Sequence, residues 1–471
     1  MSGFDAVVVG SGPNGLSAAI VLAQAGQKVV VFEAEGLIGG GARSAELTLP
    51  GFTHDICSAV HPTALGSPFF RTLPLERYGL EWIQPPVMVA HPQNDGSAAI
   101  VERSIETTAR GLGRDADAYT RLIRGVVDDW KRLESSLFGP LRWPRHPIAL
   151  ARFGLQALRS IGGLIDGRFV ETRTRALFAG HAAHGMLPLD HQLTAGFGLT
   201  LSAMCHIAGW PIARGGSQQI TNALAAHLRT LGGEIVAGTR VATIDQLPSA
   251  KLILLDLSPR PVLQIAGHRF PERYRRTLGR YRYGMGVFKV DWALDAPIPW
   301  TAEGCRRAGT VHVGGTFEEV AQSEKDAWEG RGSERPFLIL SQPTLFDPSR
   351  APAGKHVAWA YCHVPHGSTL DMLERVERQI ERFAPGFRER VLARSVMAPR
   401  DIESHNANLV GGDIGAGVSD LRQFFVRPSW RAYSTPAKGI YICSASTPPG
   451  VGVHGMCGYH AATRALHDLG R

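Results

Sequence analysis

The chain has 471 residues, of which 44% are hydrophobic and 20% are charged, and its net charge is +8. This length and composition describe a core-forming chain of two or three domains and exclude a disordered tail. The sequence has neither an apolar stretch long enough to span a bilayer nor a signal-peptide pattern, so we expect a cytoplasmic protein. The basic residues are dispersed and lie in no aromatic-rich RNA motif, so we expect no nucleic-acid partner.

The six cysteines lie far apart, at positions 57, 205, 305, 362, 443 and 457. No pair has C-x-x-C spacing, and no group of cysteines and histidines has the spacing of a zinc site. We therefore expect reduced thiols, no metal site and no disulfide-reductase chemistry.

The first forty residues predict a βαβ unit. Ala6–Val9 is a continuous apolar run, which is typical of a strand buried on both faces. A glycine-rich turn and the helical segment Leu16–Ala25 follow, and Lys28–Glu33 predicts the second strand. The turn has the G-x-G-x-x-G spacing of dinucleotide-binding proteins, and an acidic residue ends the second strand.

Residue types in this turn have distinct physical roles. Gly10 permits the tight turn, Gly12 lets backbone N–H groups approach a diphosphate, and Gly15 lets the helix pack closely on the strand. Glu33 is placed to accept hydrogen bonds from both ribose hydroxyls. The candidate cofactor contacts in this unit are Gly10, Gly12, Pro13, Asn14, Gly15 and Glu33.

A second glycine-rich segment favours FAD over NAD. Gly39–Ser44 reads GGGARS and resembles the pattern that follows the acidic residue in FAD-containing oxidoreductases of the glutathione-reductase-like superfamily. In those proteins the glycines let a loop fold back over the dinucleotide, and the arginine neutralises diphosphate charge. Gly40, Gly41 and Arg43 are therefore further candidate FAD contacts.

The middle of the chain predicts helices separated by strands. We expect helices at 104–135, 217–231, 260–283 and 368–384, strands at 234–244, 250–257 and 287–294, and a polar surface loop at 318–335. Val241, in the first of these strands, is another candidate cofactor contact. Segment 137–168 is apolar with interspersed arginines; we interpret it as a solvated helical face, with an amphipathic membrane-surface element as the alternative.

Histidines mark an apolar segment that we assign to the wall of a substrate cavity. The segment covers residues 178–210 and contains His181, His184 and His206. A single histidine in such a segment is more often a core residue than a ligand-binding one.

Lys289 is a candidate catalytic residue. Strand alternation places Val287, Lys289 and Asp291 on one face of an otherwise apolar strand. The surrounding residues resemble the strand of flavin amine oxidases, in which a lysine holds a water against flavin N5. A solvated lysine on an edge strand and a salt bridge to Asp291 are the alternatives.

The C-terminal end predicts a third cofactor element. A strand at 439–443 leads into the glycine-rich turn 444–456 and a helix at 458–469. Flavoproteins of this class place such an element under the ribityl chain and isoalloxazine, where the helix N-terminus stabilises negative charge on reduced flavin. The candidate contacts are Ser446, Gly452, Val453 and Met456. His454 is a candidate catalytic residue, with a ring that is satisfied by the local backbone as the alternative.

With these motifs, the sequence resembles the phytoene desaturase-like and retinol saturase-like branch of FAD-dependent oxidoreductases, and within it the pyridine nucleotide-disulphide oxidoreductase domain-containing proteins. Segments 50–55, 211–217 and 408–414 add to the resemblance, which covers nearly the whole chain. The chain departs from the family at Ala445-Ser446, where many members have Gly-Asp and the aspartate contacts the ribityl hydroxyls.

The resemblance implies an α/β fold with two domains. We expect a Rossmann-like FAD-binding domain from residues 1–85, 211–260 and 425–471, and a substrate domain with a mixed sheet and helices from residues 86–210 and 261–424. The oligomeric state stays open.

The implied enzyme is a desaturase or dehydrogenase with non-covalent FAD. A hydride passes from an apolar or amphipathic small molecule to flavin N5, and O₂, a quinone or another acceptor takes up the electrons. A flavin C–N oxidase acting on an amine or amino-acid derivative is one alternative. A flavin-retaining binding or assembly protein without turnover is another. Contact with a membrane would be peripheral.

Overall fold

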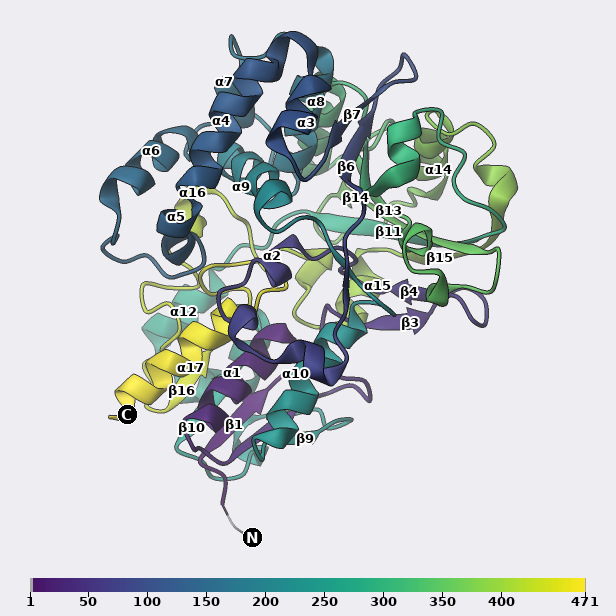
Figure 1. Ribbon diagram of the computed structural model, residues 1–471. Helices are drawn as coiled ribbons and strands as arrows, with labels where there is room; N and C mark the ends of the chain where they lie inside the picture. The colour runs from purple at the N-terminus through teal and green to yellow at the C-terminus, as the bar shows by residue number, and fades with distance from the viewer. Residues whose placement is uncertain (1–2, 471) are drawn as a thin grey trace.

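The computed structural model describes residues 3–470, which form two large sheets and a group of helices (Figure 1). The first sheet has five strands in the order β16-β10-β1-β2-β9, and all neighbours are parallel. Its strands are β1 (Ala6–Val9), β2 (Val29–Phe32), β9 (Glu234–Val236), β10 (Leu252–Leu255) and β16 (Ile440–Ile442). This is the Rossmann-like half of the predicted α/β fold, and the prediction is confirmed.

Strand β1 is buried on both faces, as its apolar run predicts. Ala6 and Val8 pack in the core that includes α1, whereas Val7 and Val9 pack in a second cluster with α11 and α12. Helix α1 packs between α10 and α17 on one side of the sheet (Figure 1). These helices are α1 (Pro13–Gln24), α10 (Gln218–Thr230), α11 (Pro259–Ala266), α12 (Glu272–Gly279) and α17 (Met456–Asp468).

The second sheet has seven strands in the order β15-β11-β14-β13-β12-β6-β7. Only β6 and β12 pair in parallel among these neighbours in the described chain. One face packs on α14 (Leu373–Glu381), with Phe288, Val290 and Trp292 in that core. The strands are β6 (Val87–Pro92), β7 (Ala98–Val101), β11 (Gly286–Leu294), β12 (Ala308–Val313), β13 (Leu338–Ser341), β14 (His356–Val364) and β15 (Val391–Met397).

Helices fill the segment between β7 and the return to the first sheet. Helix α8 packs on α9 and on α13, and α4 and α6 pack on α9. The helices of this segment are α3 (Ile105–Arg110), α4 (Ala116–Asp128), α5 (Trp130–Leu137), α6 (Pro147–Ala157), α7 (Ile161–Ile165), α8 (Thr172–Ala183) and α9 (Thr194–Ile207), whereas α13 (Phe317–Trp328) follows β12 later in the chain. No helix within residues 3–470 has the length and hydropathy needed to cross a bilayer.

Short elements connect the two sheets. They are β3 (Ser44–Glu46) with β4 (Thr53–Asp55), β5 (Trp82–Ile83) with β8 (Ile212–Ala213), and the helices α2 (Pro62–Leu65), α15 (Pro399–His405) and α16 (Leu421–Phe424).

The expected surface loop at 318–335 is wrong, because α13 occupies most of it. Thr316 and Glu319 form a capping box that satisfies free N–H groups at the helix start. Val320 and Ala327 are buried on the side of α13 that faces the core. The polar composition that suggested a loop belongs to the exposed side of an amphipathic helix.

Other predicted boundaries also differ from the structure, and the helix expected at 104–135 is three helices, α3, α4 and α5. The strand expected at 234–244 ends at Val236, because Gly238 adopts a positive φ of 68° and turns the chain back toward Glu35. The helix expected at 260–283 is two helices, α11 and α12, and the helix expected at 368–384 covers Leu373–Glu381.

Candidate active site

The glycine-rich turn between β1 and α1 leaves a cradle free of side chains. Gly10 has a φ of +101°, Gly12 is the N-cap residue of α1, and Pro13 follows at the first helical position. A Cβ on Gly12 would lie 2.9 Å from Asp256 Oδ2, and a Cβ on Gly15 would overlap the carbonyl oxygen of Gly10. The N-terminus of α1 therefore opens onto a space that suits a diphosphate.

Glu33 is held against this turn at the end of β2. Its Oε2 accepts the backbone N–H of Ser11 at 2.9 Å and the Ser11 hydroxyl at 2.5 Å, and its Oε1 accepts the N–H of Glu35 at 3.0 Å. A carboxylate has about four acceptor positions, so these three bonds leave about one for a ribose hydroxyl. The residues Thr239 and Val241 line the same part of the cavity.

The second glycine-rich segment places Arg43 beside the turn. Arg43 Nε donates to the carbonyl of Gly40 at 2.8 Å, and Nη2 donates to the carbonyl of His405 at 2.9 Å. Gly40, Gly41 and Arg43 all line the cavity. Burial lowers the pKa of Arg43 from its ordinary value, while Glu33 and Glu35 act to raise it.

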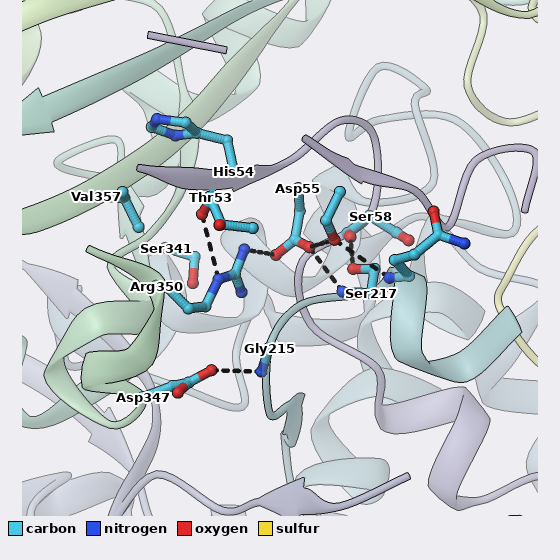
Figure 2. Close-up of polar contacts among 12 residues, drawn as sticks. Thr53, His54, Asp55, Ser58, Gly215, Ser217, Ser341, Asp347, Arg350 and Val357 are labelled. Carbon is cyan, nitrogen blue, oxygen red and sulfur yellow. Dashed lines mark hydrogen bonds and ion pairs between the residues drawn. The ribbon is translucent and has the colours of Figure 1, made fainter. Parts of the chain in front are cut away.

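A buried ion pair supports the segment that follows Arg43 (Figure 2). Asp55 accepts hydrogen bonds from Arg350 Nη2 at 2.7 Å, from the Ser44 hydroxyl at 2.8 Å and from the Ser217 N–H at 2.7 Å. Burial acts to raise the pKa of Asp55, but the Arg350 charge and these hydrogen bonds hold it below its ordinary value. The pair thus ties β4 and the start of α10 to the loop that precedes β14.

The two ends of the chain meet beside the glycine-rich turn. A Cβ on Gly458 of α17 would overlap the carbonyl oxygen of Asn14, so the two helices cross in close backbone contact. The loop before α17 lies on the cavity wall, with Gly452, Val453 and His454 among the lining residues. The His454 ring accepts the Met456 N–H at 3.0 Å through Nδ1, and burial lowers its pKa to about 4.

Ser446 is not among the lining residues of this wall in the described chain. Its hydroxyl donates to the carbonyl of Ala416 at 2.9 Å, and the residue is fully buried. Its role as a substitute for the family's ribityl-contacting aspartate stays a prediction.

One cavity of about 940 Å³ joins all of these elements. Within residues 3–470, the candidate residues on its wall are Gly10, Gly12, Pro13, Asn14, Glu33, Gly40, Gly41, Arg43, Val241, Gly452, Val453 and His454. Gly15, Ser446, Met456 and Lys289 are not among the lining residues of the described chain. The structure thus brings together candidates from the two ends and the middle of the chain.

The far end of the cavity is apolar and lies among the helices and the second sheet. Its lining includes Leu150, Phe153, Phe197, Leu201, Trp210, Ile339 and Trp359. Of the three histidines assigned to this wall, only His184 lines the cavity of the described chain. His206 is a core residue that hydrogen-bonds Tyr119 at 2.8 Å, and His181 hydrogen-bonds Ser202 at 3.1 Å.

Lys289 is buried in an interior strand and paired with Asp291. Strand β11 lies between β15 and β14, so the alternative of a solvated edge-strand lysine is wrong. Lys289 is 2% exposed and its ammonium forms an ion pair with Asp291, as the other alternative predicted. Burial raises the pKa of Asp291 to about 6, against the opposing effect of the lysine charge.

Several further charged residues line the cavity, and among them Asp256 and Arg427 were missed from the sequence. Asp256 directly follows β10 and accepts the N–H of Gly15 at 2.9 Å. Arg427 is buried and donates to the carbonyls of Ala445 and Ala416 at 3.1 and 3.3 Å. The signal for Asp256 lay in the sequence, because an acidic residue at the carboxyl end of a parallel strand lies at the ligand-binding edge of the sheet. No group of three or more His, Cys, Asp or Glu residues within 3–470 is arranged to hold a metal.

The sequence is similar to known oxidoreductases over its whole length. Residues 8–72 match the NAD(P)-binding Rossmann-like domain. One subunit of the limonene dehydrogenase of Castellaniella defragrans is 32% identical, with 99% of this chain and 95% of that protein covered. Pyridine nucleotide-disulfide oxidoreductase domain-containing protein 2 of Rattus norvegicus is 26% identical over 99% of this chain and 94% of its own. Phytoene dehydrogenase of Streptomyces griseus is 27% identical over 82% and 77%.

Solved structures share the fold at low sequence identity. An oxidoreductase from Methanosarcina mazei has a TM-score of 0.68 at 17% identity and covers 98% of this chain and 99% of its own. Cyclohexylamine oxidase from Brevibacterium oxydans has a TM-score of 0.60 at 15% identity, with full coverage of both chains, 100% each.

The parallel sheet, its glycine-rich turn and the cavity that begins there define an oxidoreductase with a nucleotide cofactor. The chain belongs to the FAD-dependent oxidoreductase family that includes this limonene dehydrogenase and the phytoene desaturases. The resemblance, the fold class and the enzyme class predicted from the sequence are confirmed.

Proposed function

We propose that this enzyme binds FAD without a covalent link and dehydrogenates an apolar or amphipathic small molecule. The observation that carries the proposal is the single cavity that runs from the glycine-rich turn to an apolar chamber. When bound, FAD supplies the hydride acceptor at its N5 atom. The protein's part is to orient the substrate, exclude water and tune the charge around the cofactor.

Several features of the dinucleotide end support FAD as the cofactor. A Cβ at Gly12 would crowd Asp256 Oδ2 at 2.9 Å, and the cradle that the glycine leaves faces the N-terminus of α1. Asn14 Oδ1 and Arg427 Nε are buried and have no hydrogen-bond partner within residues 3–470. Both residues line the cavity, so a bound dinucleotide would find an acceptor and a charged donor that the fold does not use.

The cysteines near the cofactor end support a non-covalent link. Cys443 and Cys457 are fully buried and lie off the cavity wall of the described chain. Cys57 does line the cavity, but burial raises the pKa of its thiol and so disfavours the nucleophilic thiolate. Cys457 Sγ donates to the carbonyls of Thr447 and Gly450 at 3.4 Å. Burial raises the pKa of Cys457 to about 12, so the nucleophilic thiolate is scarce at neutral pH.

The apolar lining supports a substrate with a large hydrocarbon part. Relatives in the family are named for the dehydrogenation of limonene and phytoene, which are hydrocarbons. The C–N oxidase alternative depended on Lys289, whose charge is neutralised by Asp291 and which does not line the cavity of residues 3–470. Dehydrogenation at a C–H bond is therefore the reaction that we favour, with O₂, a quinone or another diffusible acceptor as the final oxidant.

Purification and anaerobic titration test the proposal. We expect yellow protein that releases free FAD on denaturation, and bleaching of the flavin by terpenoids but not by amines. Bleaching by amines alone would favour the C–N oxidase. A flavoprotein that no substrate bleaches, and whose cellular role survives loss of turnover, would favour the non-catalytic alternative. Colourless protein that cannot be reconstituted with FAD would refute the whole proposal.

We also propose that the enzyme is cytoplasmic and that segment 141–159, which forms part of the cavity wall, makes peripheral contact with an anionic membrane. Segment 141–159 contributes lining residues and also exposes Trp143, Ile148 and Leu155, which are 90%, 76% and 78% exposed. It contains four arginines and no acidic residue. Exposed aromatic and aliphatic residues beside arginines match a lipid headgroup region.

Vesicle flotation tests this contact. We expect binding to phosphatidylglycerol vesicles, less binding to phosphatidylcholine vesicles, and loss of binding in the variant Trp143→Ser with Leu155→Ser. Equal flotation of the variant and the wild type would refute the contact.

A further inference from the structure

A pair of histidines connects the apolar end of the cavity to the second sheet. His184 directly follows α8 and lies on the cavity wall. Its Nε2 lies 3.0 Å from Nε2 of His312, which is fully buried on β12. Two ring nitrogens at this distance share one hydrogen, so one ring donates and the other accepts.

The surroundings of His312 decide which ring donates. Burial lowers the pKa of His184 to about 3 and that of His312 well below its ordinary value, so at neutral pH each ring carries one hydrogen. His312 Nδ1 packs against the backbone of Gly180, where a Cβ would overlap it, and has no hydrogen-bond partner within residues 3–470. Because a buried N–H without an acceptor is rarely tolerated, the hydrogen of His312 belongs on Nε2, from which His184 Nε2 accepts it.

A neighbouring histidine has the same arrangement. His91 Nε2 lies 2.8 Å from the carbonyl oxygen of Gly315, which can only accept, so the hydrogen of His91 must be on Nε2. Its Nδ1 is buried and without a partner in the described chain, and therefore carries a lone pair. In both His91 and His312, the buried Nδ1 without a partner thus carries the lone pair, and the ring hydrogen on Nε2 is used in a hydrogen bond.

We propose that His184 presents an Nδ1–H donor to the cavity and that this donor binds an oxygen of the substrate. Since Nε2 of His184 accepts from His312, its own hydrogen is on Nδ1, and that atom bonds no residue within 3–470. A hydrocarbon would leave this donor unpaired, whereas a ketone, alcohol, ether or carboxylate would satisfy it. The substrate class is an apolar molecule with an acceptor oxygen, an inference that refines the proposed function and rests on it.

Binding of a matched pair of probes to the FAD-loaded enzyme tests the donor. The probes are 4-phenyl-2-butanone and butylbenzene, which differ in one carbonyl, and the measurement is the dissociation constant from perturbation of the flavin spectrum. In His184→Phe, which keeps the aromatic volume, we expect the ketone to bind about fivefold to tenfold more weakly and the hydrocarbon to bind within twofold of the wild type. In His184→Asn, whose amide N–H can occupy the place of Nδ1–H, we expect ketone affinity close to that of the wild type.

A variant that weakens both probes equally, or neither, overturns the inference. So does a wild-type enzyme that prefers butylbenzene or binds neither probe. Nitrogen NMR of the ¹⁵N-histidine-labelled wild type provides a test that needs no mutation, because it reports which ring nitrogen of His184 carries the hydrogen. A hydrogen on Nε2 overturns the inference, even where the FAD content and the bleaching by substrates support the proposed function.

Discussion

Replacement of Asp256 by asparagine removes one carboxyl from the dinucleotide end of the cavity and is expected to change the pH dependence of stability. Asp256 directly follows β10, and its Oδ2 accepts the N–H of Gly15 at 2.9 Å. Burial raises the pKa of Asp256 to about 7, and the nearby charge of Glu33 acts in the same direction. Asparagine has nearly the same shape and can accept the same hydrogen bond, but it has no charge to titrate.

The sign follows from the two pKa values of this carboxyl. Its pKa is about 7 in the folded protein and 3.8 as the ordinary value, so between these values the folded state holds a proton that the unfolded state has lost. The contribution of Asp256 to stability is fully present below about pH 4 and is lost as the pH rises to about 7. The difference between the two values corresponds to about 4 kcal/mol.

Urea unfolding of the wild type and the Asp256→Asn variant between pH 4.5 and 8.5 measures this effect. Buried histidines such as His61 and His454, whose pKa values burial lowers to about 4, act in the opposite direction. They are common to both proteins and cancel in the difference. We expect the variant to gain stability relative to the wild type as the pH rises. A difference that stays constant across this range would refute the reasoning.

The remaining predictions concern the cradle and the buried charges. Gly12→Ala should purify without flavin, because its methyl group would lie 2.9 Å from a carboxyl oxygen of Asp256 and fill the cradle. The control Gly125→Ala, on the surface of α4, should keep the flavin and raise the free energy of unfolding in urea by about 1 kcal/mol. Arg350→Met should lower the free energy of unfolding by about 3–5 kcal/mol, because it leaves the buried Asp55 unpaired, and a double variant that also carries Asp55→Asn should recover most of that loss. Lys289→Met should keep its flavin and lose stability relative to the wild type increasingly above pH 6, because the buried carboxyl of Asp291 must stay protonated once the lysine charge is gone. An equal loss of stability at pH 5 and pH 8 would contradict this.

The sequence predicted the dinucleotide end of the site well because local chemistry determines it. The apolar run of β1, the glycine turn and Glu33 lie within one βαβ unit, and each residue type has few alternatives there. The strand and helix at the C-terminal end were predicted for the same reason. Their meeting with the first unit depends on Gly458, whose missing side chain lets α17 approach Asn14.

The apolar chamber was only partly predictable, because pairing between distant segments builds it. Strands β12, β13 and β14 of the second sheet pair with neighbours far away in sequence, and their short apolar runs cannot be distinguished from buried helix by periodicity. Among the three histidines of segment 178–210, only packing decides that His184 reaches the cavity while His181 and His206 bond to core residues. The ion pair between Asp55 and Arg350 likewise joins residues that no local pattern connects.

The charge balance at the dinucleotide end makes cofactor affinity depend on pH. Glu33, Glu35 and Asp256 line the dinucleotide end of the cavity, where the lining cations include Arg43 and also Arg240, whose charge is paired with Glu35. The N-terminus of α1 adds only a partial positive charge. Ionisation of Asp256 near pH 7 adds a negative charge at the diphosphate, so we expect the FAD affinity of the wild type to fall between pH 6 and pH 8.5 and that of Asp256→Asn to stay nearly constant. Equal pH profiles of flavin release would show that Asp256 does not face the diphosphate.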